Sequence, residues 1–96
     1  MKVVYKYGIL SDIVKLPADC QILHIGTQRD EGLFAWVLCD PNNTQLVDSL
    51  RVVETGHSLT EDEFSQCGEF LGTFKLVNDR LVVHVWELNR HLNLTT

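Results

Sequence analysis

The chain has 96 residues, of which 45% are apolar and 22% are charged, and 13 acids against 8 bases give it a net charge of −5. This length holds one domain with a single modest core. The acidic balance and the scattered bases argue against general nucleic-acid binding, which needs clustered Lys and Arg. No apolar run approaches the length of a membrane span. A second lysine at position 6 comes too early for a signal peptide, so we expect a cytoplasmic protein.

Six segments are predicted to form β-strands, because each combines strand length with alternating or continuous apolar residues. The signal is strongest at residues 33–41, which are apolar from Leu33 to Cys39 and should be covered on both faces. The expected strands are residues 3–10, 20–28, 33–41, a strand within 45–55, 69–77 and 80–88.

The first strand should lie at or near the edge of its sheet, because Lys6 and Gly8 fit poorly into a strand covered on both faces. Residues 11–15 are expected to connect it to a turn at residues 16–19, where a proline fixes its own φ. The second and third strands should pair antiparallel, because only the short polar loop 29–32 separates them.

Alternation within the strands predicts which side chains share a face. It places Ile22, His24 and Gly26 together on one face of the second strand. The fourth strand has an irregular pattern around residues 48–49, which suggests a bulge or a late start. In the fifth strand the residues expected to point inward are Phe70, Gly72, Phe74 and Leu76.

The one long stretch without strand character follows the fourth strand. Thr60 and Glu63 have the spacing of a capping box, in which each side chain bonds the backbone amide of the other residue. We therefore expect at most one short helical turn near residues 60–65. Leu59 and Phe64 are expected to cover one end of the core.

Short strands separated by turn signals predict an all-β fold, either a small antiparallel six-strand sandwich or a partly open barrel. Residues 40–43 suit a β-turn, with Asp in the first position and Pro in the second. Residues 78–79 suit a two-residue hairpin turn. Residues 1–96 should form a single domain in which 89–96 are a flexible tail.

Several short blocks, taken in order, resemble one known family. The blocks are YKYGIL, LPADCQILHIGTQ, LFAWVLCDP, RVVETGHSL, FLGTFKL and LVVHVWEL, and together they span about residues 3 to 88. They resemble a family of short bacteriophage and prophage proteins with a KYPL-like opening, an LWALVDP-like central strand, a TGHP-like loop and a VFHVFE-like ending. The chain departs from that pattern at Gly8, at Asp19-Cys20 and at Ser58, where the family usually has a proline that would stiffen the loop. The resemblance implies a phage origin and a β fold, and it brings no established activity.

The sharpest candidate site is the Thr55-Gly56-His57 loop at the end of the fourth strand. Gly56 permits a positive φ, and His57 is then presented at a loop. Alternation turns Arg51 and Thr55 toward the same side. Together Arg51, Thr55, the Gly56 amide and His57 could hold a small anion or a nucleotide phosphate. The alternative is structural, with Gly56 making a turn and His57 packing against the loop.

Two aromatic residues, Tyr7 and Trp36, are candidates to stack a base or another flat ligand. The alternative is that they are core or interface aromatics, since each lies in a strand with apolar neighbours. His24 and His84 lie within strands, where a histidine either carries a proton for a site or is packed with a hydrogen-bond partner.

No residue pattern signals a metal site or a catalytic centre. Cys20, Cys39 and Cys67 are widely spaced and are expected to be reduced, mostly buried thiols. A zinc site would need about four converging ligands. Cys39 has no histidine base placed beside it. We therefore expect no metal, no cofactor and no enzymatic activity.

The first functional expectation is a non-enzymatic, phage-encoded binding module that sequesters a small nucleotide-derived ligand as an anti-defence sponge. Such a module is expected to be a homo-oligomer, with another subunit covering one apolar face of residues 33–41 or 80–88 unless the sheet closes into a barrel. The alternative is a protein-interaction or structural module that binds a host or phage protein through an exposed strand edge. Its candidate surfaces are residues 3–10 and the acidic residues 61–63.

Overall fold

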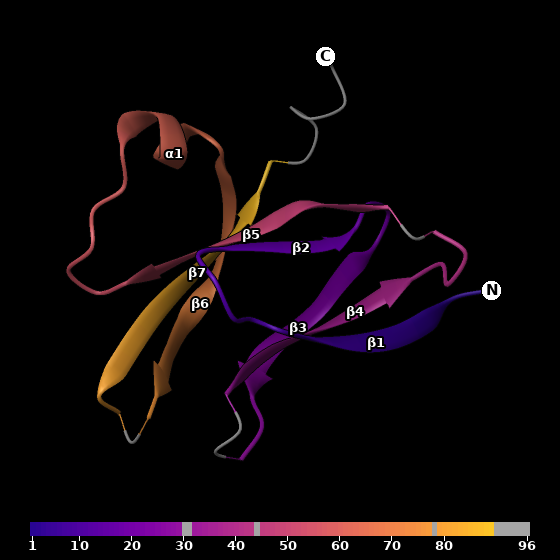
Figure 1. Cartoon of the computed structure of the whole chain (residues 1–96), viewed down its shortest axis with the longest axis horizontal. Helices are drawn as coiled ribbons and strands as arrows, with labels where there is room; N and C mark the ends of the chain where they lie inside the picture. Colours follow the sequence, from indigo (N-terminus) through magenta and orange to yellow (C-terminus); the bar gives the residue numbers. More distant parts are fainter. Residues whose placement is uncertain (30–31, 44, 78, 90–96) are drawn as a thin grey trace.

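The computed structural model describes residues 1–29, 32–43, 45–77 and 79–89, and it shows an all-β fold of two antiparallel sheets (Figure 1). Sheet A has the strand order β1-β4-β3, and sheet B has the order β2-β5-β7-β6. The two sheets do not close into a barrel, so the expectation of a sandwich is the one confirmed. The elements are β1 (Val3–Gly8), β2 (Ile13–Pro17), β3 (Gln21–Thr27), β4 (Leu33–Cys39), β5 (Leu46–Glu54), α1 (Glu61–Ser65), β6 (Cys67–Leu76) and β7 (Leu81–Leu88).

The described residues form seven strands, so the expected number of six is wrong by one. The additional strand is β2, which lies where the sequence suggested a connector and a turn. Val14 and Leu16 are buried, while Lys15 between them points outward and forms an ion pair with Asp48 at 2.9 Å. The sequence did not predict this strand because it is short and ends at a proline, a residue that usually interrupts strands. A proline is tolerated here because β2 lies at the edge of its sheet.

The core lies between the sheets and is built by the inward side of each. From sheet A it takes Ala35 and Val37, and from sheet B it takes Leu16, Leu50 and Val85, all of them fully buried. Burying a valine or leucine side chain contributes about 1.5–3 kcal/mol. Because β1 and β3 belong to one sheet and β2 to the other, the chain crosses between the layers early and cannot be a simple meander.

Bulges change which side chains share a face. In β3 the register with β4 shifts between Ile22 and His24, so Leu23 is the extra residue. Ile22 therefore lies opposite Val37, whereas His24 lies opposite Trp36. The expectation that Ile22 and His24 share a face is wrong, because an inserted residue reverses the alternation beyond it.

A similar correction applies to β6, whose register with β7 shifts on both sides of Phe70. Phe70 pairs with Trp86 on the outer face and is 49% exposed, so it does not point into the core as expected. The irregularity expected at residues 48–49 is confirmed, since the β2–β5 register shifts there and leaves Ser49 unpaired and fully buried.

Helix α1 has the capping box that the sequence predicts, with Thr60 as N-cap and Glu63 returning to the Thr60 amide. It belongs to a long loop that projects away from sheet B (Figure 1). None of its residues is buried, and Phe64 is 59% exposed. The expectation that Phe64 covers one end of the core is therefore wrong.

The β-turn expected at residues 40–43 is confirmed by a 3.0 Å hydrogen bond from the Asn43 amide to the Asp40 carbonyl. The tips of the two expected hairpin loops at 30–31 and 78, and residues 90–96 of the expected tail, lie outside the described residues. No helix within the described ranges is long and apolar enough to cross a membrane.

Candidate functional site

The outer face of sheet B carries the polar residues that the sequence singled out. Arg51 lies opposite Trp86 in the β5–β7 ladder, and Val53 lies opposite His84. Thr55, two residues further along, also reaches His84. Arg51 and Thr55 therefore share a face, as alternation predicts, but their side chains bond to different partners.

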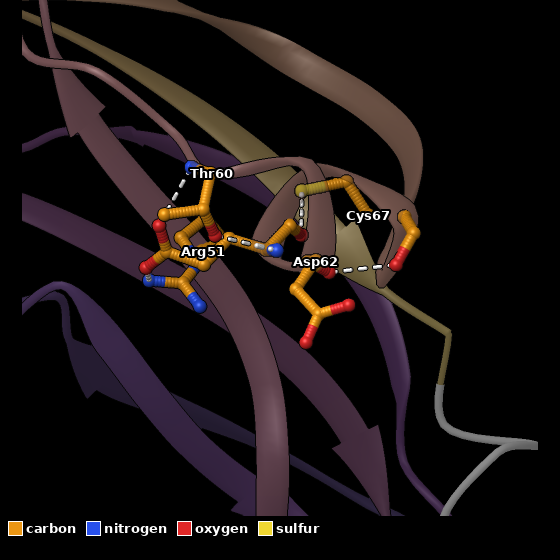
Figure 2. A network of polar contacts seen from close by, with 6 residues as sticks. Arg51, Thr60, Asp62 and Cys67 are labelled. Carbon is orange, nitrogen blue, oxygen red and sulfur yellow. Dashed lines mark hydrogen bonds and ion pairs between the residues drawn. The ribbon is translucent and has the colours of Figure 1, made fainter.

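Arg51 forms an ion pair with a residue of helix α1 (Figure 2). Its Nη1 lies 3.1 Å from Oε2 of Glu63, while Oε1 of Glu63 accepts a hydrogen bond from the Thr60 amide. The Arg51 side chain is only 13% exposed, and its buried Nε has no hydrogen-bond partner among the described residues. The guanidinium therefore fixes α1 on sheet B, a role that the sequence could not show because Glu63 reaches Arg51 only through the fold.

The Glu63 carboxylate is held in its charged form. Hydrogen bonds from Thr60, chiefly from its backbone amide, and the nearby charge of Arg51 lower the pKa of Glu63 below its ordinary value. The capping box and the ion pair thus use the same carboxylate.

The loop that follows β5 turns back on the strand. Gly56 has a φ of 93°, the positive value that the sequence leads us to expect of this glycine. The His57 amide donates to the Glu54 carbonyl at 3.0 Å, and the His57 ring lies 3.7 Å from the Glu54 carboxylate. The His57 ring therefore lies near an acidic residue, Glu54, at the end of the preceding strand β5.

The cleft between Arg51 and His57 is small and acidic. Its volume is about 80 Å³, and its lining includes Asp12, Glu54 and Glu63. Small-molecule sites usually occupy about 300–1,000 Å³. Three carboxylates around one paired guanidinium also disfavour an anion, so this cleft gives little support to a phosphate site.

His84 of β7 bonds to a residue of β6 and to the residue that directly follows β5. Its Nε2 lies 2.7 Å from the Thr55 hydroxyl, and its Nδ1 lies 2.9 Å from the Thr73 hydroxyl. Threonine hydroxyls both donate and accept, so either tautomer of the imidazole is satisfied. The sequence did not predict that Thr73 bonds to His84, because this contact depends on the pairing of β6 with β7.

Trp36 lies on the opposite side of the molecule, on the outer face of sheet A. Its ring is 5.5 Å from the His24 ring and 6.2 Å from the Phe34 ring. The Lys6 ammonium lies 4.7 Å from the centre of the Phe34 ring and donates to Gln28 at 2.7 Å. These contacts form an aromatic face on sheet A.

Tyr7 lies in a third place, on the inner side of β1 opposite Ala35. With Tyr5 it lines a hollow of about 280 Å³, whose wall is formed by sheet A and by the end of β2. Burial raises the pKa of the Tyr7 hydroxyl, and nearby Cys39 adds to the effect. The other residues around the hollow are Pro17, Cys39, Asp40, Pro41, Asn43 and Leu46.

The predicted site residues therefore fall into three separate groups. Arg51, Thr55, Gly56 and His57 lie along the end of β5, Trp36 on sheet A, and Tyr7 at the hollow. Within the part of the chain that the structure describes, no group of three or more His, Cys, Asp or Glu side chains is arranged to hold a metal ion. Burial raises the pKa of the Cys67 thiol, which disfavours its reactive thiolate form.

The sheet edges differ in a way that bears on binding. The pairing of β1 with β4 runs through six residue pairs from Val3 to Gly8 without a register shift, which confirms that β1 is a regular edge strand. At the opposite edge of sheet A, β3 is interrupted by the extra residue Leu23. In sheet B, β6 is bulged around Phe70, and the β2 pairing shifts at Lys15.

A family model described as "Domain of unknown function (DUF7352)" matches residues 1–94 of this chain. No curated protein and no solved structure matches it.

Replacing Glu63 with Gln is expected to lower the midpoint of thermal unfolding at pH 7, because the uncharged amide loses the ion pair with Arg51. A carboxylate with a lowered pKa stabilises the fold fully above its unfolded pKa of about 4.3, and that contribution is lost as the pH falls through the folded value. The difference between native and Glu63→Gln protein should therefore close on acidification.

The matched control is Glu61→Gln, which removes a charge from the same first turn. Circular dichroism melts from pH 7 to pH 3 would measure both variants. A gap for Glu63→Gln that stays constant across this range would contradict the assignment.

Proposed function

We propose that this chain, which belongs to the DUF7352 family, is a non-enzymatic interaction module that accepts a β-strand from another polypeptide along β1. The observation that supports the proposal best is the regular, apolar edge that β1 presents, in contrast to the bulged or shifted pairings of the other edge strands. Proteins usually protect edges with bulges, charges or prolines, because an open edge pairs with any available strand. The edge of β1, which has no bulge and no proline, is therefore the best candidate for pairing with a strand of another polypeptide.

The side chains of β1 leave that edge accessible. Its one charged residue, Lys6, leans across sheet A toward Phe34 and Gln28. Val4 and Tyr5 are 52% and 42% exposed, which is high for apolar and aromatic residues in a strand. An added strand would bury both, and backbone hydrogen bonds would supply the rest of the affinity.

The reactive side chains support a binding role over a catalytic one. His84 has both ring nitrogens engaged by threonine hydroxyls, and Arg51 is paired with Glu63. Arg51 lines the small cleft that holds His57 and Ser58, but its guanidinium is already paired there with Glu63. A phage origin and a place in the host cytoplasm are part of the proposal, and they rest on the sequence resemblance and the acidic composition.

A second candidate function, the sequestering of a nucleotide-derived ligand, is favoured by the hollow beside β1. Tyr5 and Tyr7 offer ring faces there, and Asp40 and Asn43 offer polar groups at its margin. Aromatic side chains stack bases in a sequence-tolerant way. The volume of about 280 Å³ suits a single flat ring rather than a whole nucleotide.

Val4→Lys should abolish strand addition, because a charge on an open edge disfavours pairing. Leu23→Lys is the matched control, since Leu23 is 49% exposed on the opposite edge of the same sheet. Native mass spectrometry of protein purified from host cells would report any bound polypeptide, whether a second copy or another protein. We expect the native chain and Leu23→Lys to retain it and Val4→Lys to retain at least tenfold less. Equal retention by all three would refute the proposal.

For the second candidate, titration calorimetry with a nucleotide panel should show binding that Tyr7→Ala weakens at least tenfold. Arg51→Ala and His57→Ala should change it less than twofold, because their cleft lies on sheet B. If no nucleotide binds the native chain, or if Arg51→Ala abolishes binding while Tyr7→Ala does not, the hollow is not the ligand site.

A further inference from the structure

The free hydrogen-bonding groups of β1 can be assigned to particular residues. The Ile9 amide donates to the Leu33 carbonyl at 2.9 Å, one residue beyond the β1–β4 ladder and in the same register. Hydrogen-bonded and non-hydrogen-bonded pairs alternate along an antiparallel ladder. The backbones of Val3, Tyr5 and Tyr7 therefore bond to β4, whereas those of Val4, Lys6 and Gly8 face the open side.

We propose that the strand accepted at this edge is β1 of a second copy, paired antiparallel across a two-fold axis. This inference rests on the proposed function, and it names the partner. A two-fold contact is self-complementary, so one regular edge supplies both halves of the interface. It would join two three-stranded sheets into one continuous sheet of six strands.

The lysines of the N-terminal segment disfavour two of the possible registers. Val4, Lys6 and Gly8 must pair among themselves or with Lys2, because only even-numbered residues have outward-facing backbone groups. An axis at Lys6 would place Lys6 opposite the partner's Lys6. An axis at Val4 would place Lys6 opposite the partner's Lys2. Like charges directly opposite each other are destabilising, which disfavours both arrangements.

An axis at Tyr5 avoids both repulsions. It places Val4 opposite the partner's Lys6 and Lys2 opposite the partner's Gly8, and it overlaps all of β1. The two pairs formed by Val4 and Lys6 would exchange about four backbone hydrogen bonds.

The same register brings both copies of Tyr5 together on the inner side of the sheet. Tyr5 and Tyr7 line the hollow beside β1, so the hollow of each copy would open onto the interface. The aromatic face on the outer side would continue from one copy to the other, because Phe34 and Trp36 lie on β4 next to β1. The dimer would thus cover the open edge and extend both surfaces.

Single cysteine substitutions can identify the register directly. Opposite residues in a non-hydrogen-bonded pair have Cα atoms about 4.5 Å apart, which lies within the range that a disulfide spans. Tyr5→Cys should therefore form a covalent dimer on mild oxidation, reversed by dithiothreitol. Val4→Cys and Lys6→Cys should form at least tenfold less, since neither lies opposite itself. The native chain, in which Cys20 and Cys39 are buried and Cys67 is part-buried, is the background control.

The mass of the native chain by light scattering across a concentration series completes the test. We expect the mass to rise to that of two chains, and Val4→Lys to stay at that of one. Stronger cross-linking of Lys6→Cys or Val4→Cys than of Tyr5→Cys would overturn the register. A native chain that stays monomeric at every concentration would overturn the dimer.

The failure of this inference can be told apart from failure of the proposed function. If the native chain is monomeric but carries a different bound polypeptide that Val4→Lys loses, the second copy is wrong and strand addition stands. If Val4→Lys loses no polypeptide of any kind, both are wrong.

Discussion

Strand β4 has two apolar faces, and the arrangement of the rest of the molecule follows from covering them. Its inner residues Leu33, Ala35, Val37 and Cys39 are buried against sheet B. Its outer residues, among them Phe34 and Trp36, are covered only in part, by His24 and by the stem of Lys6. Sheet A has just one strand on each side of β4, so the outer face stays half open and β1 is left as an edge. The core and the candidate interface therefore depend on the same strand.

The polar groups of sheet B serve the fold itself. Arg51 holds α1 through Glu63, and His84 of β7 bonds to Thr73 of β6 and to Thr55, which directly follows β5. Both ring nitrogens of His84 are already bonded and Arg51 is already paired with Glu63, so a ligand at either residue would first have to break an existing bond. For this reason Arg51 and His84, whose side chains have the most potential for ligand chemistry, support a binding function less well than the backbone of β1 does.

The fold class was predictable, because strand alternation and turn residues are local signals. Periodicity identified β4, β7 and the edge position of β1, and the Thr60–Glu63 spacing identified the helical turn. The face of the sheet on which Ile22 and Phe70 lie was not predictable. One extra residue in a bulge moves every side chain beyond it to the other face of the strand. Nor could the sequence show that Arg51 pairs with Glu63, or that Arg51, Trp36 and Tyr7 lie in three different places, because those distances are set by the packing of the two sheets.

The central claim is that β1 works through its open edge, and amide hydrogen exchange measured by NMR on the native chain at high concentration tests it most directly. Without a partner strand, the amides of Val4, Lys6 and Gly8 face solvent, while those of Tyr5 and Tyr7 are bonded to β4. With β1 paired to a second copy, the amides of Val4 and Lys6 should become protected as strongly as those of Tyr5 and Tyr7, and dilution should remove that protection. Fast exchange at Val4 and Lys6 at every concentration would contradict the account.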